Sequence, residues 1–180
     1  PSPLREGKGY FPAIGNEYKK ENQYGKKSRW AAGDVANLCI GQGEITVTPL
    51  QMAVMTAAIA NGGKLIQPRL VLNVGSLNPD NESSVIEISK KVVKNLNLKN
   101  ETVSLLHEAM LADVDDPDGS GRGARVRGMS IGGKTGTAEK KVPTGKFHPK
   151  TGVRLFRMDH ITWFVSFAPV ESPRYAMVVM

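Results

Sequence analysis

Cysteine is nearly absent from this sequence of 180 residues, which contains only Cys39. A single thiol excludes a disulfide within the chain, and no cluster of histidine or further cysteine joins it at metal-ligand spacing. Cys39 stands between Leu38 and Ile40, a setting typical of a small buried hydrophobic residue. We therefore expect Cys39 to be buried and no metal to be bound.

Long hydrophobic runs are also missing. No stretch of 18 or more apolar residues is present to span a membrane, and no signal-peptide pattern opens the chain. The first residue is Pro1 and the last residues, 175–180, form an apolar strand, so we expect both ends to be cut from a longer protein. The 40% content of hydrophobic residues is sufficient for the core of one domain.

Acidic residues are fewer than basic ones, which gives the chain a formal net charge of +7. The basic residues gather mainly at 19–29, 122–127 and 140–157. No aromatic-interleaved or groove-reading motif accompanies them, so the pattern favours a solvated basic surface and no nucleic-acid partner. Attraction to an anionic cell envelope is the alternative.

Two helices are predicted from their end signals. Residues 48–51, Thr-Pro-Leu-Gln, match a capping box, and the Asn-Gly-Gly at 61–63 supplies a stop, so a helix should span 49–60. This helix is apolar on most sides, which predicts that it is buried, with Met52 and Met55 in the core.

The second helix should follow Asn100 as its N-cap. Its core-facing stripe is predicted to consist of Val103, Leu106, Met110 and Val114. His107 lies beside the stripe without a second metal ligand at the right spacing, so we expect a structural or surface role. The acidic stretch 113–121 resembles a calcium loop, but Arg127 occupies the position of the last ligand, so a turn between helix and strand is favoured.

β-Branched and aromatic residues predict strands at 129–139 and 160–168, and an apolar strand at 175–180. Residues 140–157 are basic and contain proline and glycine, so they are predicted to form a loop beside the first strand. Residues 1–29 show no helical or strand period and are predicted to be a loop-rich N-terminal segment.

The most informative stretch is Gly-Gly-Lys-Thr-Gly-Thr-Ala-Glu at 132–139. Lys134 should lie on a strand between Gly133 and Gly136, which have no Cβ to obstruct the approach of another backbone. The ammonium of Lys134, the hydroxyls of Thr135 and Thr137 and the amides of an unpaired strand edge together suit an anion or a carbonyl oxygen.

Residues 128–135 also satisfy the nucleotide-binding P-loop pattern G-x-x-x-x-G-K-[ST]. That motif needs a buried strand before it and a helix directly after it. Here the charged stretch 122–127 precedes the motif, and Gly136 and Pro143 interrupt any helix after it. A P-loop nucleotide hydrolase is therefore the less favoured alternative.

Three stretches resemble the class B penicillin-binding proteins, most closely the elongation-type penicillin-binding protein 2. The segment 133–139 contains the Lys-Thr-Gly signature of this family. The segment 41–63 begins Gly-Gln-Gly and ends Ala-Asn-Gly-Gly, and the segment 159–169 runs from Asp-His to Ala-Pro. The resemblance covers residues 30–180 and implies an α+β fold with an antiparallel sheet packed with helices, of which this chain is the C-terminal part.

The resemblance implies a peptidoglycan D,D-transpeptidase that acts by serine acyl transfer on D-alanyl-D-alanine stem peptides. Lys134 would support the electrostatics of the site and anchor the terminal carboxylate, and the hydroxyls of Thr135 and Thr137 would bind the same group. Gly136 belongs to the substrate-binding motif, and the Thr137 backbone N–H would be one oxyanion donor. Alternation places the side chains of Lys134 and Thr135 on opposite faces, so both can serve only at a strand edge.

The family's nucleophile and base lie in a Ser-x-x-Lys motif, which this sequence does not contain. The stretch 76–78 matches the family's Ser-x-Asn motif formally, but it follows the Gly-Gln-Gly segment, whereas the family places it before. We therefore expect this chain to have no nucleophile and to be inactive alone. A non-catalytic relative that has lost its nucleophile is a third interpretation.

The resemblance further implies the partners and the location. The partners would be peptidoglycan stem peptides, β-lactam antibiotics, the remaining half of the transpeptidase domain and the cell-wall elongation machinery. The parent protein would face the periplasm from an anchor in the cytoplasmic membrane. No cofactor is implied.

Overall fold

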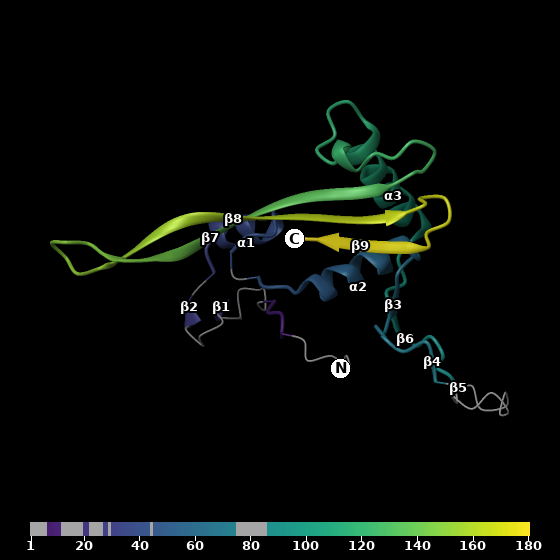
Figure 1. Ribbon diagram of the computed structural model, residues 1–180, viewed down its shortest axis with the longest axis horizontal. Coiled ribbons are helices and arrows are strands. Elements are labelled where there is room, and N and C mark those ends of the chain that lie inside the picture. Colours follow the sequence, from purple (N-terminus) through teal and green to yellow (C-terminus); the bar gives the residue numbers. More distant parts are fainter. Residues whose placement is uncertain (1–6, 12–19, 22–26, 29, 44, 75–85) are drawn as a thin grey trace.

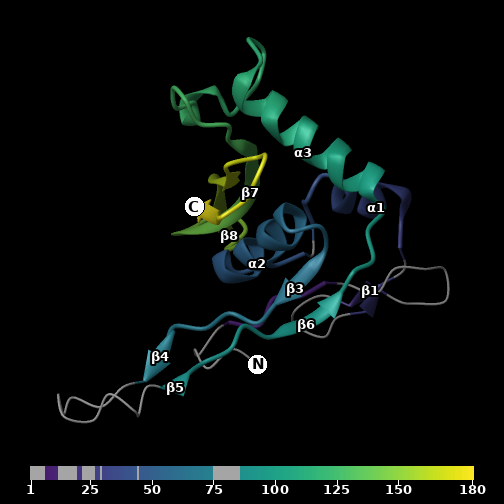
Figure 2. The same cartoon turned by 90° about the vertical axis from the view of Figure 1, so that its right-hand side faces the viewer.

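The computed structural model describes residues 7–11, 20–21, 27–28, 30–43, 45–74 and 86–180. Its main sheet has three antiparallel strands in the order β7-β8-β9. The strands are β7 (Gly132–Phe147), β8 (Arg154–Ala168) and β9 (Tyr175–Val179). The helices α2 (Pro49–Ala60) and α3 (Asn100–Asp115) lie beside this sheet (Figure 1; Figure 2). The predicted α+β class with an antiparallel sheet is confirmed.

The core lies where the two helices meet the sheet. α2 contacts β8 and β9, and α3 contacts β7. Phe167 of β8 is only 1% exposed. Around it pack Ala60, Met110 and Val165. The ring of His107 lies 4.8 Å from the Phe167 ring, and its Nε2 is 3.0 Å from the carbonyl oxygen of Ile59, so His107 joins α3 to α2 in the predicted structural role.

α2 has the predicted ends. Thr48 Oγ1 accepts a hydrogen bond from the Gln51 N–H (3.2 Å), and Gln51 Oε1 accepts one from the Thr48 N–H (2.9 Å), which forms the predicted capping box. The chain leaves the helix through Gly63, whose φ of +100° favours glycine. Met52 packs against the core, but Met55 is 44% exposed, so its predicted burial is wrong. Met55 lines an open apolar pocket together with Leu65 and Leu98, which leaves part of its side chain in contact with solvent.

α3 begins one residue earlier than predicted. Lys99 is the N-cap and Asn100 is the first helical residue, so the prediction of Asn100 as the N-cap is wrong. The N-cap side chain makes no hydrogen bond to the helix, which is why a capping signal misplaced the start. The apolar stripe is confirmed, because Met110 and Val114 are buried in the interface with the sheet.

β7 and β8 form one long hairpin that projects from the body of the molecule (Figure 1). Their pairing continues without a break from Gly132–Phe167 to Pro143–Phe156 and closes with Phe147 opposite Arg154. The predicted loop over residues 140–157 is therefore wrong. Most of that segment extends the two strands, and only residues 148–153 connect them.

The loop was predicted partly because of Pro143, since proline usually interrupts a sheet. β7 is an edge strand of this sheet, where a missing N–H on the open side breaks no ladder bond. The start of β7 also differs from the predicted residue 129. Val126 and Met129 form an isolated bridge, and the strand begins at Gly132.

Smaller elements complete the described chain. The short strands form three antiparallel pairs: β1 (Lys20–Glu21) with β2 (Lys27–Ser28), β3 (Lys64–Ile66) with β6 (Val92–Asn95), and β4 (Asn73–Val74) with β5 (Ile86–Glu87). The helix α1 (Ala32–Cys39) has no buried residue, so Cys39 is exposed and its predicted burial is wrong. The stretch 76–78 lies outside the described residues. No helix within the described ranges is long and apolar enough to cross a membrane.

Ser130 ties the β8–β9 turn to the start of β7. Its hydroxyl donates a hydrogen bond to the Glu171 carboxylate and accepts one from the Val170 N–H (3.0 Å). The Ser130 hydroxyl, followed by the backbone of Glu171 itself, holds the pKa of the Glu171 carboxyl below its usual value. A lowered carboxyl pKa contributes stability above the ordinary pKa, and this contribution is lost as the pH falls through the lowered value.

Candidate active site

The Lys-Thr-Gly-Thr segment lies on β7, at the edge of the sheet. β8 pairs with β7 on one side, and the other side has no neighbouring strand in the described part of the chain. The strand predicted for Lys134 is confirmed. β7 continues to Phe147, so no helix begins after Thr135 and the P-loop alternative is wrong.

Gln42 shows which backbone groups of β7 face the open edge. Its Nε2 donates a hydrogen bond to the Thr137 carbonyl (3.0 Å), and its Oε1 accepts one from the Glu139 N–H (3.4 Å). The N–H and the C=O of one strand residue point to the same side. The Thr137 N–H therefore lies on the open edge, where the predicted oxyanion donor must lie.

Two glycines turn the chain on either side of Gln42. Gly41 has a φ of +73° and Gly43 a φ of +87°, both in the region that favours glycine. These turns bring the Gln42 amide to β7 across 95 residues of sequence. The segment at residues 41–43 was singled out in the sequence by its family resemblance. Its contact with Thr137 was not predicted, because no rule of residue spacing predicts contacts between segments so far apart.

Lys134 and Thr135 meet at the open edge. Lys134 Nζ is 3.3 Å from Thr135 Oγ1 and 3.1 Å from the Thr135 carbonyl oxygen. Neighbouring side chains leave a strand on opposite faces, so the lysine must curl around the edge to make these contacts. The geometric condition for their joint action is therefore met. The ammonium stays accessible, since the Lys134 side chain is 59% exposed.

Ser120 and Asp113 extend this group toward α3. Ser120 Oγ donates a hydrogen bond to Asp113 Oδ1 (2.7 Å) and lies 2.5 Å from Thr135 Oγ1. The single proton of Ser120 is used by Asp113, so Thr135 donates its own proton to Ser120. Lys134 Nζ also lies 3.5 Å from Asp113 Oδ1. Four polar side chains thus form one connected cluster at the edge of β7.

The turn after α3 holds this cluster in place. The Gly121 N–H donates a hydrogen bond to the Asp113 carbonyl (2.8 Å). The turn predicted for residues 113–121 is confirmed for 116–121, whereas residues 113–115 still belong to α3. A Cβ on Gly121 would lie 2.7 Å from Asp113 Oδ2 and 3.2 Å from the Phe164 ring, so the close approach requires glycine. Sequence reasoning missed that Ser120 and Asp113 lie beside Lys134 and Thr135, because the turn signal alone does not indicate what the turn contacts.

Gly133 and Gly136 differ in their surroundings. A Cβ on Gly133 would lie 2.5 Å from the Phe164 ring and 2.9 Å from Val114, so this position is filled from inside the protein. The nearest atom to a Cβ on Gly136 would be 3.7 Å away, on Trp163. The predicted free approach to the strand therefore holds for Gly136 and is wrong for Gly133, whose missing side chain serves the internal packing.

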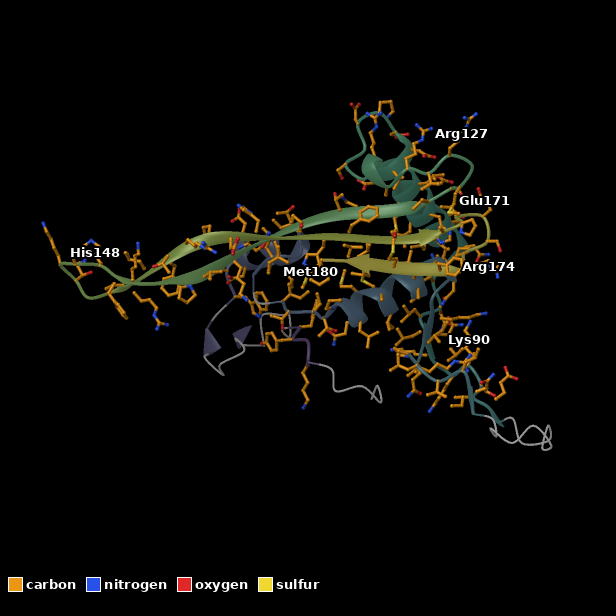
Figure 3. The ribbon with its side chains drawn as sticks, in the orientation of Figure 1. Lys90, Arg127, His148, Glu171, Arg174 and Met180 are labelled. Atoms are coloured by element: carbon orange, nitrogen blue, oxygen red, sulfur yellow. The ribbon has the colours of Figure 1, made fainter. Side chains whose placement is uncertain are left out.

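The histidines outside the core lie away from this cluster. His148 is at the tip of the hairpin (Figure 3), where its Nδ1 accepts hydrogen bonds from the N–H groups of Lys150 and Thr151 (3.3 Å each). His160 pairs across the hairpin with Glu139. In the ranges that the structure describes, no group of three histidine, cysteine or acidic side chains is arranged to hold a metal ion.

A comparison with protein families shows which family the chain belongs to. Residues 9–180 match the family described as "Penicillin binding protein transpeptidase domain". The chain belongs to this family. The family resemblance seen in the sequence is confirmed, and the Lys-Thr-Gly motif of the penicillin-binding protein transpeptidases is the segment found on the β7 edge.

Individual relatives agree with the family. The chain is 33% identical over 176 residues to the peptidoglycan D,D-transpeptidase MrdA of Acinetobacter baumannii, which covers 97% of this chain and 24% of the relative. It is 30% identical to the peptidoglycan D,D-transpeptidase FtsI of Escherichia coli K12, with 98% of this chain and 26% of the relative covered. The chain thus spans about a quarter of the length of these transpeptidases.

A solved structure gives the same fold. Penicillin-binding protein A from Mycobacterium tuberculosis, determined as a ceftriaxone acyl-enzyme complex, is similar with a TM-score of 0.57 and 26% sequence identity. The similarity covers 80% of this chain and 28% of that one.

Proposed function

We propose that this chain forms the Lys-Thr-Gly wall of a peptidoglycan D,D-transpeptidase active site. One observation carries the proposal: Lys134, Thr135 and the Thr137 N–H come together on the open edge of β7 in a member of the penicillin-binding protein transpeptidase family. Named relatives that are D,D-transpeptidases support the reaction. The domain proposed here is residues 30–180 as the C-terminal part, preceded by the loop-rich segment 1–29.

The reaction proposed is acyl transfer through a serine ester. A serine oxygen attacks the carbonyl carbon between the two D-alanines of a stem peptide, the C–N bond breaks, and the terminal D-alanine leaves with a proton on its nitrogen. The amine of a second stem peptide then attacks the ester, which forms the cross-link and returns the proton to the serine. The sequence contains no Ser-x-x-Lys, so the serine and its base must come from a segment outside this chain.

Each residue of the edge has a place in this reaction. The Thr137 N–H donates to the oxyanion of the tetrahedral intermediate, and Lys134 supplies positive charge at the cleft. Gly136 leaves the strand open to the substrate backbone. The hydroxyls of Thr135 and Thr137 bind the terminal carboxylate.

To bind the carboxylate, the Thr135 hydroxyl must donate its proton to the substrate instead of to Ser120 Oγ. A charged carboxylate favours this exchange, because it accepts a stronger hydrogen bond than a neutral hydroxyl.

The family relationship also supports partners and a location. We infer that β-lactams acylate the same site, as ceftriaxone does in the acyl-enzyme complex of penicillin-binding protein A. The remaining half of the transpeptidase domain would complete the cleft beside β7. The cell-wall elongation machinery would be the cellular partner, and the parent protein would face the periplasm from a cytoplasmic-membrane anchor.

The test is covalent labelling of the full-length protein by a fluorescent penicillin. Lys134→Ala should slow acylation by about a hundredfold or more, the loss typical of an electrostatic group in an acyl-transfer site. The exposed Lys90, which lies away from the hairpin (Figure 3), provides the matched control, and Lys90→Ala should label like the wild type. The 180-residue chain alone should remain unlabelled.

Two results would contradict the proposal. If Lys134→Ala labels as fast as the wild type, the role given to Lys134 is wrong. If the wild-type full-length protein does not label, the chain belongs to a non-catalytic member of the family.

A further inference from the structure

The positive charge of this protein is concentrated in the projecting part of the β7–β8 hairpin. We call residues 140–157 the arm. The arm contains six basic residues and no acidic one, so it contributes +6 to a chain whose total formal charge is +7. The basic residues of the arm are Lys140, Lys141, Lys146, Lys150, Arg154 and Arg157. The other 162 residues are close to neutral, and the arm is therefore the basic surface of the molecule.

The arm stands free of the rest of the described chain. Every residue from 143 to 160 is exposed. The hairpin projects away from the helices to its tip at His148 (Figure 3). From Lys140 to Phe147 the strand extends roughly 23 Å at the usual rise of about 3.3 Å per residue. Such a ribbon has room for several contacts in a row.

Apolar side chains are exposed between these charges. Phe147 is 58% exposed and Phe156 is 54% exposed. The Arg154 guanidinium lies over the Phe147 ring, 5.9 Å from its centre. An open hollow of about 610 Å³ lies on the arm. Its walls are Pro143, Thr144, Lys146, Leu155, Phe156 and Arg157. Cations and ring faces side by side suit a partner that carries both carboxylates and non-polar or sugar surfaces.

We propose that the arm binds the carboxylate-bearing strands of peptidoglycan beyond the reactive stem peptide. This inference rests on the proposed function, which makes peptidoglycan the substrate. The arm is the direct continuation of the strand that carries Lys134, so a strand held on the arm leads to the cleft. A long polymer with a carboxylate on each repeat matches a ribbon with six cations spaced along it.

The distribution of apolar side chains disfavours a lipid partner. Binding to a membrane interface strengthens with the apolar area that the bound segment buries there. The connecting residues 148–153 are His, Pro, Lys, Thr, Gly and Val. Val153 is the one large aliphatic residue among them, and the exposed rings of Phe147 and Phe156 lie behind the connection. The arm therefore fits contact along its length better than insertion at its end.

Cosedimentation with purified peptidoglycan tests this inference. The full-length protein would carry Lys146→Gln, Lys150→Gln and Arg154→Gln together, and the matched control would carry the same change of charge at Lys90, Lys91 and Lys94, which are exposed on the body. The arm variant should bind about tenfold more weakly, since each exposed ion pair contributes a factor of roughly two. The control variant should bind like the wild type. Amidation of the peptidoglycan carboxylates should remove the difference between the two variants.

Penicillin labelling of the same proteins separates the two proposals. All three should label at the same rate, because the substituted residues lie outside the cleft. If the wild type labels but both variants bind peptidoglycan equally, the inference about the arm is wrong and the proposed function stands. If the arm variant loses binding to phosphatidylglycerol vesicles but binds peptidoglycan as the wild type does, the inference about the arm is overturned in favour of a membrane partner. A wild type that does not label contradicts the proposed function itself.

Discussion

Gly133 and Gly136 lie three positions apart, on either side of Lys134 and Thr135, and they meet different physical requirements. The Phe164 ring and Val114 occupy the space that a Gly133 side chain would need. Gly136 has ordinary van der Waals room for a methyl group. The two glycines of the motif thus differ, because Gly133 belongs to the packed interior and Gly136 to the exposed strand surface.

Substitution of these glycines by alanine should separate the two roles. Gly133→Ala forces the Phe164 ring and Val114 apart, and such overpacking should lower the free energy of unfolding by about 1–3 kcal/mol. Gly136→Ala should change the free energy of unfolding by less than about 1 kcal/mol, which is the usual range of residue preferences in a strand. Thermal unfolding of the full-length protein measures both. Equal losses for the two variants would show that the contacts at Gly133 do not determine its identity.

The contacts of Ser120 and Asp113 show which part of the candidate site could not be predicted from the sequence. Lys134, Thr135 and Thr137 were predicted as a site, because a cation, hydroxyls and glycines occur together in a family motif. Ser120 reaches Thr135 only because Gly121 lets the turn pack against Asp113. Contacts of this kind depend on the path of a turn through space, and no local propensity specifies that path.

At the scale of elements, the open edge of β7 is bounded by Gln42. Its side chain amide pairs with Thr137 and Glu139 as the backbone of a neighbouring strand would. A strand that pairs with this edge would find it free up to the Thr137 N–H, whereas Gln42 occupies it from the Thr137 carbonyl to the Glu139 N–H. In the proposed active site, residues 41–43 would therefore bound one end of the edge that binds substrate.

Hydrogen exchange should report this boundary. Gln42→Ala removes the acceptor for the Glu139 N–H, and loss of one hydrogen bond of about 1 kcal/mol should speed the exchange of that amide roughly fivefold. The backbone amide of Lys134 faces β8 and should keep its rate. Gln51→Ala, which disturbs only the start of α2, serves as the control. An unchanged Glu139 rate would mean that Gln42 does not hold the edge.

The elements differ in how well the sequence predicted them, for physical reasons. The ends of α2 were correct, because the capping box and the glycines act within one turn of chain. The strands of the arm were missed, because proline, glycine and lysine disfavour a strand locally, whereas pairing along thirteen registered positions stabilises it. Met55 and Cys39 were expected in the core on apolar character alone, and exposure depends on which elements cover them.

At the scale of the whole molecule, the arm and the body are separate in their energetics. The buried residues lie on α2 and α3, on the turns that follow these two helices, and on the inner ends of the sheet strands, whereas residues 143–156 are all exposed. Val142 and Arg157 face each other across the hairpin. A short turn could therefore join these two residues directly.

Shortening the arm should leave the body intact. Replacement of residues 143–156 by Asn-Gly, the favoured two-residue hairpin turn, should change the unfolding midpoint of the full-length protein by less than about 2 °C, since exposed residues contribute little to stability. Penicillin labelling should also persist. A drop in the midpoint well beyond that range would show that the arm packs against another part of the protein.

The free side of β7 has a further consequence, for solubility. A strand of sixteen residues with an open edge is a template on which a second copy could add its own edge and begin an aggregate. Pro143 lies on the same alternation as Thr137 and Glu139, so it removes one N–H from the exposed row. The six cations of the arm repel the same cations on another copy. The side of the strand that the proposed function requires to stay open is thereby protected from other copies of the protein.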